Sequence, residues 1–158
     1  MTRWPVPLIA LMLLTTSAVA SQPYVVLRTR AQPFKVTDTD THAIPLDDRG
    51  RTHEGWTYDA AVKPMVVITY SAECWSQGSG SYVSITILVD KRPAEPKGGG
   101  DMILCADSPE SGNYPVLATR VVIAQTKYLQ QHQVEILAKG VNTSMWQVAH
   151  SALTVIAP

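Results

Sequence analysis

Seven side chains able to bind a metal ion or to transfer a proton lie close together in the first third of the chain. They are Asp38, Asp40, His42, Asp47, Asp48, His53 and Glu54. Calcium takes about six to eight oxygen ligands, mostly from carboxylates and carbonyl groups in loops. The candidate calcium ligands are the aspartates Asp38, Asp40, Asp47 and Asp48. Their spacing matches neither an EF-hand nor a standard zinc motif, so a solvated loop of mixed charge is the alternative interpretation.

Aromatic side chains form a second candidate binding group. They are Trp56, Tyr58, Trp75, Tyr82, Tyr114 and Trp146. Exposed rings on a β-sandwich can bind carbohydrate by stacking on the sugar, with polar groups at the rim. Trp75 stands beside a loop rich in glycine and serine, and we predict that it is the most exposed ring. The predicted binding set is Trp75, Trp56, Tyr58 and Tyr82. The alternative is that the tryptophans fill the ends of a hydrophobic core.

No pattern in the sequence identifies a catalytic site. The chain has no G-x-S-x-G nucleophile elbow, no H-E-x-x-H zinc motif and no paired-carboxylate motif. Glu73 is predicted to form a structural salt bridge with Arg120 or Lys127 rather than to act as a general base. We therefore predict no catalytic residue and no enzyme activity, and a hydrolase is the least favoured alternative.

The chain contains two cysteines, Cys74 and Cys105. An even number of cysteines in an exported chain indicates a disulfide bond. A bond closing a loop of about thirty residues would stabilise the fold by roughly 3–4 kcal/mol. Two buried free thiols are the alternative. The chain has neither a C-x-x-C motif nor a zinc ribbon, so we expect neither a redox site nor a zinc site at these cysteines.

Alternating apolar and polar residues predict strands through most of the chain. The alternation is clearest between Met65 and Asp90, where two strands flank the loop Trp75–Ser81. Further strands are predicted at about 21–30, 56–58, 102–105, 116–126, 133–139 and 146–156. No segment shows a sustained helical period. The pattern predicts an all-β fold, a single antiparallel β-sandwich of about eight strands that is jelly-roll-like, with an immunoglobulin-like sandwich as the alternative.

Two segments allow more specific predictions. The run from Asp47 to Gly55 is strongly polar and predicts an exposed, mobile loop. The continuous apolar run Val121-Val122-Ile123 predicts a buried strand.

The first twenty residues have the features of a secretory signal peptide. Arg3 supplies the positive charge, Val6–Leu14 is the apolar segment, and Ala18-Val19-Ala20 is the small-residue cleavage site. Cleavage would leave residues 21–158 as one domain with 13 − 1 = 12 basic and 13 acidic residues. This near-neutral balance argues against nucleic acid as a partner. No later stretch reaches the roughly 20 apolar residues of a membrane span, so we expect a periplasmic or extracellular protein.

Parts of the chain resemble a group of small exported bacterial proteins of unassigned function. The similar segments are Ser71–Cys74, Val83–Asp90, Gln133–Ile136 and Trp146–Val155. The last two also loosely resemble the final strands of C1q/TNF-like jelly-roll domains. The chain departs from the exported group at Gln130-Gln131-His132, where relatives have a glycine, and at Val148-Ala149-His150, where they have Leu-Asp-Asp. The resemblance implies export and a β-sandwich, and it transfers no activity.

Together these features predict a secreted, non-catalytic protein that acts in extracytoplasmic binding or structural interaction. A carbohydrate-binding module that uses exposed aromatic rings is the main alternative. The expected partners are a glycan or another protein, and the jelly-roll likeness implies a homo-oligomer. Calcium is the one metal for which the sequence offers ligands, and no other cofactor is expected.

Overall fold

A computed structural model of the chain describes residues 24–57, 65–95, 102–106, 115–126 and 131–157. These residues form eleven strands, of which eight are five residues or longer, as the prediction of about eight strands requires. No helix in the described part of the chain is long and apolar enough to cross a membrane. The predicted signal peptide at residues 1–20 lies outside the described residues.

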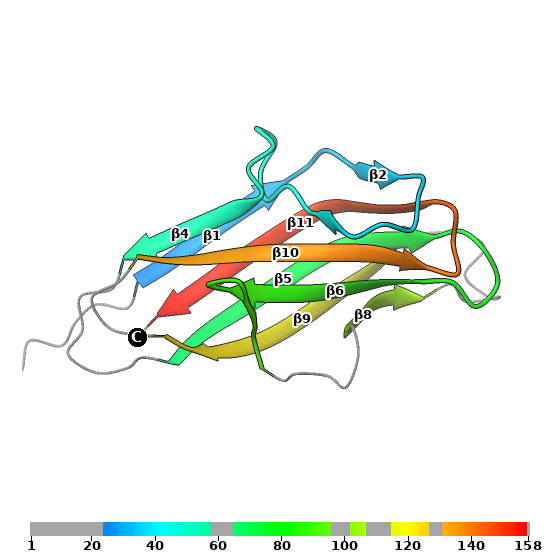
Figure 1. Cartoon of the computed structure of the whole chain (residues 1–158). Helices are drawn as coiled ribbons and strands as arrows, with labels where there is room; N and C mark the ends of the chain where they lie inside the picture. The colour runs from blue at the N-terminus through cyan, green and yellow to red at the C-terminus, as the bar shows by residue number, and fades with distance from the viewer. Residues whose placement is uncertain (1–23, 58–64, 96–101, 107–114, 127–130, 158) are drawn as a thin grey trace, which may run out of the picture.

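The strands form two antiparallel sheets that pack face to face (Figure 1). Sheet A consists of β1 (Tyr24–Arg30), β2 (Phe34–Val36), β5 (Met65–Ser76), β9 (Val116–Gln125) and β11 (Trp146–Ala157). Sheet B consists of β3 (His42–Ala43), β4 (His53–Thr57), β6 (Tyr82–Val89), β7 (Arg92–Pro93), β8 (Met102–Ala106) and β10 (Gln131–Val141).

The strand order identifies the sandwich as jelly-roll-like. Sheet A runs β1-β11-β5-β9, and in sheet B β4 pairs with β10, β10 with β6, and β6 with β8. Numbered along the chain, the eight long strands therefore give the orders 1-8-3-6 and 2-7-4-5. In an immunoglobulin sandwich the first two strands share a sheet, whereas here β1 and β4 lie in different sheets. This arrangement confirms the all-β, jelly-roll-like prediction and removes the immunoglobulin-like alternative.

The core lies between the sheets and follows the period of two in the sequence. Along β5, each inward-facing side chain from Val66 to Ser76 is buried, and its neighbours are half-buried or exposed. β10 shows the same alternation, with Val134, Ile136 and Ala138 facing inward. Successive side chains of a strand point to opposite faces of the sheet, so this register places Val66, Ile68, Val134 and Ile136 in the core.

A disulfide bond between Cys74 of β5 and Cys105 of β8 connects sheet A to sheet B. The Cα atoms are 5.9 Å apart, and Cys74 is 1 % and Cys105 7 % exposed. The predicted bond is confirmed. Its position shows that it fastens the two layers of the sandwich to each other, which the sequence did not indicate.

An ion pair connects the two sheets again, between β1 and β4. Glu54 is only 5 % exposed, and its carboxylate accepts hydrogen bonds from Arg28 Nε at 2.6 Å and Arg28 Nη2 at 2.9 Å. Arg51 Nη1 donates to the same carboxylate at 3.0 Å. Glu54 therefore does not lie in a mobile loop as predicted. The last residues of the polar run, His53 to Gly55, belong to β4, because they pair with β10. The two arginines allow the Glu54 carboxylate to be buried there.

Close packing of Trp146 against Gly140 closes the sandwich where β10 turns into β11. A Cβ at Gly140 would lie 2.5 Å from Trp146 Cδ1 and 2.5 Å from Thr143 Cγ2. The indole Nε1 of Trp146 donates to the carbonyl of Asp38 at 3.2 Å. The indole is fully buried, so only a residue without a side chain fits at position 140.

Tyr70 makes the stability of the fold sensitive to alkaline pH. Its side chain is fully buried in the core. Burial raises the pKa of Tyr70 from 10.0 to about 12, although Ser151 and Arg30 act in the opposite direction.

We expect the free energy of unfolding to fall between pH 10 and pH 12, because the unfolded state loses the Tyr70 proton first. The pKa of about 12 corresponds to a loss of about 1.4 kcal/mol at pH 11 relative to pH 9. Urea denaturation at both pH values would measure it. The Tyr70→Phe variant should lack this part of the pH dependence, and an equal slope in both proteins would contradict the assignment.

Candidate functional site

The outward-facing side of sheet A is built from three cross-strand rows of side chains on β1, β11, β5 and β9. The first row is Val25, Ile156, Val67 and Ile123; the second is Leu27, Thr154, Thr69 and Val121; the third is Thr29, Ala152, Ser71 and Thr119. We call this surface the sheet A face. Its rows follow directly from the antiparallel register of the four strands.

Most of the exposed large apolar side chains gather on this surface. Nine such side chains are exposed in the described part of the chain, and seven of them lie on the sheet A face or at its ends. The seven are Val25, Leu27, Met65, Leu117, Val121, Ile123 and Ile156. Leu117 at 71 % and Val25 at 58 % are the most exposed. Scattered exposed apolar residues are ordinary on a protein surface, but their gathering on one face makes this face the candidate interaction site.

The three rows carry no charged side chain. Charge appears at the borders of the rows: beyond the third row, where Glu73 Oε2 lies 2.8 Å from His150 Nδ1, at Lys35 of β2, and at the β9 edge, where Glu95 pairs with Ile123 of the first row. The outer side of sheet B differs, since β10 alone places Gln131, Gln133, Glu135 and Lys139 on it. The apolar character is therefore specific to one of the two outer faces.

A β-bulge sets the polar end of the sheet A face. The register of β11 with β5 shifts between Ala149 and Ala152, and His150 has a φ of 44°. The extra residue turns the imidazole to the outside, where it meets Glu73. The predicted salt bridge of Glu73 with Arg120 is wrong, because Arg120 crosses to β8 and donates to the carbonyls of Ile103 and Leu104. Lys127 lies outside the described residues.

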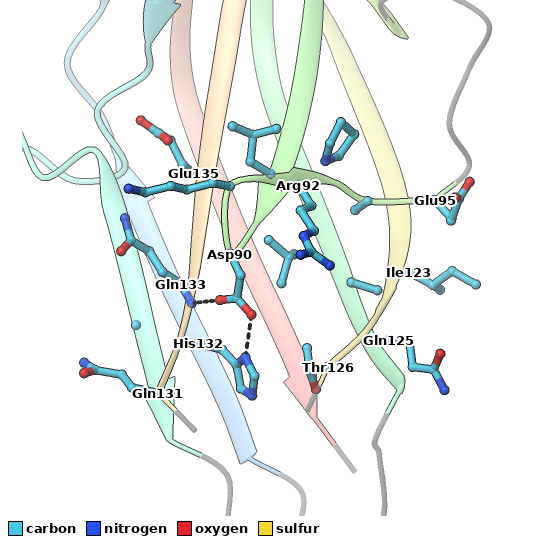
Figure 2. Close-up of a pocket in the computed structure, with 17 residues that line it drawn as sticks. Asp90, Arg92, Glu95, Ile123, Gln125, Thr126, Gln131, His132, Gln133 and Glu135 are labelled. Atoms are coloured by element: carbon cyan, nitrogen blue, oxygen red, sulfur yellow. Dashed lines mark hydrogen bonds and ion pairs between the residues drawn. The ribbon is translucent and has the colours of Figure 1, made fainter. Parts of the chain in front are cut away.

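A pocket of about 930 Å³ opens at the end of the sandwich where the β6–β7 turn, the end of β9 and the start of β10 meet (Figure 2). Its lining mixes carboxylates, amides and cations with apolar side chains. Asp90 and His132 are the paired titratable groups at its centre, with Asp90 Oδ2 2.8 Å from His132 Nδ1. The imidazole is fully buried and packs against Trp56, with the ring centroids 5.6 Å apart.

The geometry of the Asp90–His132 pair indicates a structural role. Asp90 Oδ1 accepts a hydrogen bond from the Gln133 amide at 3.0 Å, and the Asp90 amide donates to the Gln133 carbonyl at 2.9 Å. An aspartate beside a histidine can orient the imidazole for general-base catalysis. Such a base must reach a proton on the substrate, and the buried His132 ring offers no exposed surface for one. The pair holds the β6–β7 turn to β10.

That turn provides a stability test. Asp90 and Lys91 have φ values of 52° and 64°, and they connect the paired residues Val89 and Arg92. This is the geometry of a type I′ turn, which favours Asn or Asp followed by Gly. A side chain in the left-handed region costs about 1 kcal/mol.

We expect Lys91→Gly to raise the free energy of unfolding by about 0.5–1 kcal/mol, since Asp-Gly suits this turn and Asp90 keeps its contacts. Thermal or urea denaturation would measure the change. Lys91→Ala is the matched control and should have little effect, because alanine keeps the strain. If the glycine variant were less stable than the alanine variant, the left-handed geometry would be wrong.

No protein-family model matches the chain, and no curated protein matches it. Solved structures of viral coat proteins are similar in fold. The D431N mutant VP2 protein of infectious bursal disease virus in T=1 particles has a TM-score of 0.52 and 11 % identity, with 97 % of this chain and 36 % of that chain covered. The T13 particle of the same virus has a TM-score of 0.52 and 14 % identity, with 96 % and 35 % covered. The likeness is one of fold. This chain spans about a third of the length of these proteins.

The structure does not assemble the predicted aromatic site. Trp56 is 2 % exposed and lies in the core, so it offers no face for a sugar ring. Trp75 belongs to β5 rather than to the loop, pairs with Gln147 and is half-buried. Tyr82 starts β6 and is also half-buried. Tyr58 lies outside the described residues. Trp146 is in the core, so the alternative, tryptophans that fill the core, describes Trp56 and Trp146 correctly.

The four predicted calcium ligands have separate local roles. Asp38 pairs with His42 at 2.6 Å, which lowers the pKa of the Asp38 carboxyl. Asp47 accepts hydrogen bonds from the amides of Arg51 and Arg49, and these lower its pKa. Asp48 Oδ1 accepts from the amides of residues 31 and 32, and the amide of Asp40 donates to Asp38. No three acidic, histidine or cysteine side chains within the described ranges form a group able to hold a metal. Calcium binding stays a prediction.

The sheet A face was missed because its apolar residues were assigned to the core. Val121 is 54 % and Ile123 41 % exposed, and only Val122 between them is buried. The prediction of a buried strand at 121–123 is therefore wrong: β9 is an edge strand with one side in the core. The signal was present, since a run that is apolar on both faces is typical of a strand covered on both faces.

Proposed function

We propose that this chain is an exported, non-catalytic interaction protein that binds another protein through the sheet A face. The concentration of exposed apolar side chains on this uncharged face carries the proposal. Protein interfaces have an apolar core from which charged residues are depleted. The three rows have this composition, and the polar outer side of sheet B does not.

Export is supported by the signal-peptide pattern of residues 1–20 and by the resemblance to small exported proteins. The Cys74–Cys105 bond adds to this argument, because disulfides persist in oxidising compartments and are rare in the cytosol. An exported protein whose mass corresponds to a chain beginning at Ser21 would support the cleavage site.

A binding role is favoured over catalysis by the environment of the groups that could transfer protons. His132 is fully buried next to Asp90. His42 pairs with the carboxylate of Asp38, and His150 pairs with the carboxylate of Glu73. Within the described residues, neither the His42–Asp38 pair nor the His150–Glu73 pair has a serine, threonine or cysteine nucleophile hydrogen-bonded to it.

A photo-crosslinking amino acid at position 121, in the protein expressed and exported by its host, would test the proposal. We expect adducts with another polypeptide chain from position 121 and few from position 133, which lies on the outer side of sheet B. Equal adduct yields from both positions, or none from either, would overturn the assignment of the sheet A face.

A further inference from the structure

We infer that the partner of the sheet A face is a second copy of this chain, stacked face to face about a two-fold axis that runs along the second row of the face. The inference rests on the proposed function, because it names the occupant of the same surface. The second row consists of Leu27, Thr154, Thr69 and Val121.

The strand sequences are those of strands covered on both sides. Three of the four strands have unbroken apolar runs at the first row, and two of these runs also reach the second row. The runs are Val25-Val26-Leu27, Met65-Val66-Val67-Ile68 and Val121-Val122-Ile123. One side of each run packs in the core, and the other is exposed. A second sheet over the exposed side would give these runs the environment that such sequences favour.

The charge distribution favours a second copy over a charged partner. The three rows are uncharged, so they offer nothing to attract an acidic or a basic surface. Of the charges at their borders, Glu73 and His150 pair with each other, and Glu95 lies at the β9 edge, next to Ile123. A two-fold dimer places the same surface on both sides, and an uncharged surface meets its copy without repulsion.

The outer side of sheet A as a whole is large enough for a stable dimer. Its four strands lie about 4.8 Å apart and are seven to twelve residues long. At about 3.3 Å per residue, this whole outer side, which includes the three rows and the residues beyond them, covers roughly 19 Å by 33 Å. This projection of roughly 600 Å² underestimates the accessible surface of a corrugated face. Standard interfaces bury about 800 Å² per partner, so the dimer must use, besides the three rows, the exposed apolar residues at their ends, Met65 and Leu117.

The graded size of the rows determines the axis. The first row holds four branched apolar side chains, and the third holds Thr29, Ala152, Ser71 and Thr119, which are smaller. An axis along the second row places the first row of each copy over the third row of the other. In these two outer rows large side chains then meet small ones, which is how packed layers interdigitate, while each residue of the second row meets its own copy. An axis parallel to the strands would instead place the large rows on each other.

Pairing of copies through the β9 edge is less favourable than stacking. Ile123 already exchanges two backbone hydrogen bonds with Glu95, at 2.8 Å and 2.7 Å. Arg120 reaches from β9 to the carbonyls of Ile103 and Leu104 in β8. These contacts occupy part of the edge that a strand from another copy would need.

Sedimentation of the full-length chain, as its host processes it, would test the inference. We expect a dimer at about 10 µM. The Leu27→Lys, Val121→Lys variant should weaken the dimer at least a hundredfold, because four unpaired charges would enter an apolar interface. The matched control, Gln131→Lys with Gln133→Lys on the outer side of sheet B, should leave the dimer unchanged. Circular dichroism would verify that both variants are folded.

Crosslinking would test the axis. Val121→Cys chains should crosslink to each other with a short bis-maleimide, because the axis places each β9 over its copy. In a mixture with Leu27→Cys chains, crosslinks between unlike chains would instead support the strand-parallel axis and overturn ours.

The outcomes separate the two proposals. A monomer that still crosslinks from position 121 to a different protein in the host would overturn the second copy and leave the interaction function standing. A dimer that survives both lysines on the sheet A face would overturn the role of this face, and a monomer with no crosslink would overturn both proposals.

Discussion

Removing the Cys74–Cys105 disulfide is expected to lower the free energy of unfolding by about 3–4 kcal/mol. The two cysteines are 31 positions apart in the chain, so the bond between them restricts a long loop in the unfolded state. It also joins β5 to β8, and therefore sheet A to sheet B. We expect the whole sandwich to lose stability, because the bond is the covalent link between β5 and β8. The ion pair of Glu54 with Arg28 also joins the two sheets, but it lies between β1 and β4 and cannot replace this link.

Urea denaturation of the Cys74→Ala, Cys105→Ala variant would measure the loss. Alanine is the appropriate replacement because both positions are buried, where a serine hydroxyl would need a partner. The parent protein in a reducing agent serves as the control and should resemble the double variant. Equal unfolding midpoints for the oxidised parent and the double variant would contradict the stabilising role.

The Gly140→Ala substitution is expected to lower the free energy of unfolding by roughly 3 kcal/mol, near the upper end for overpacking of a core. The new Cβ would lie 2.5 Å from both Trp146 Cδ1 and Thr143 Cγ2. Trp146 cannot easily move aside, because it is fully buried and its indole donates to the carbonyl of Asp38. The turn between β10 and β11 would have to shift instead.

Gly55→Ala is a matched control for this substitution, since Gly55 also lies in a strand of sheet B. A Cβ there would meet its nearest neighbours at 3.5 Å, an ordinary contact. Chemical denaturation of both variants should therefore show a large loss for position 140 and a small one for position 55. Similar losses at both positions would mean that the general cost of replacing glycine, rather than the indole, determines the result.

Several features of the fold could be predicted because they depend on local sequence. The alternation in β5, β6 and β10 predicts which side chains face the core, since the period of two is a property of any extended strand. The disulfide follows from the number of cysteines in an exported chain. The eight long strands follow from the distribution of turn residues.

The candidate site could not be predicted, because exposure depends on which strands become neighbours. Val121 and Ile123 have the composition of a core strand, yet both are exposed because they point outward from sheet A, on the side away from sheet B. Trp56 has the composition of a binding residue, yet it packs against His132 in the core. Glu54 looks like a loop carboxylate, and its burial depends on Arg28, which lies 26 positions earlier in the chain.

The sequence by itself determined a β-sandwich with one disulfide bond, because strand periodicity and cysteine count act within single segments. Only the tertiary structure decided the jelly-roll-like strand order, because pairings such as β1 with β11 join residues more than a hundred positions apart. The same pairings decided the site. They align Val25, Ile156, Val67 and Ile123 from four distant segments into one row. The sequence of each segment shows that its residues are apolar, but only the assembled sheet shows which of them remain exposed.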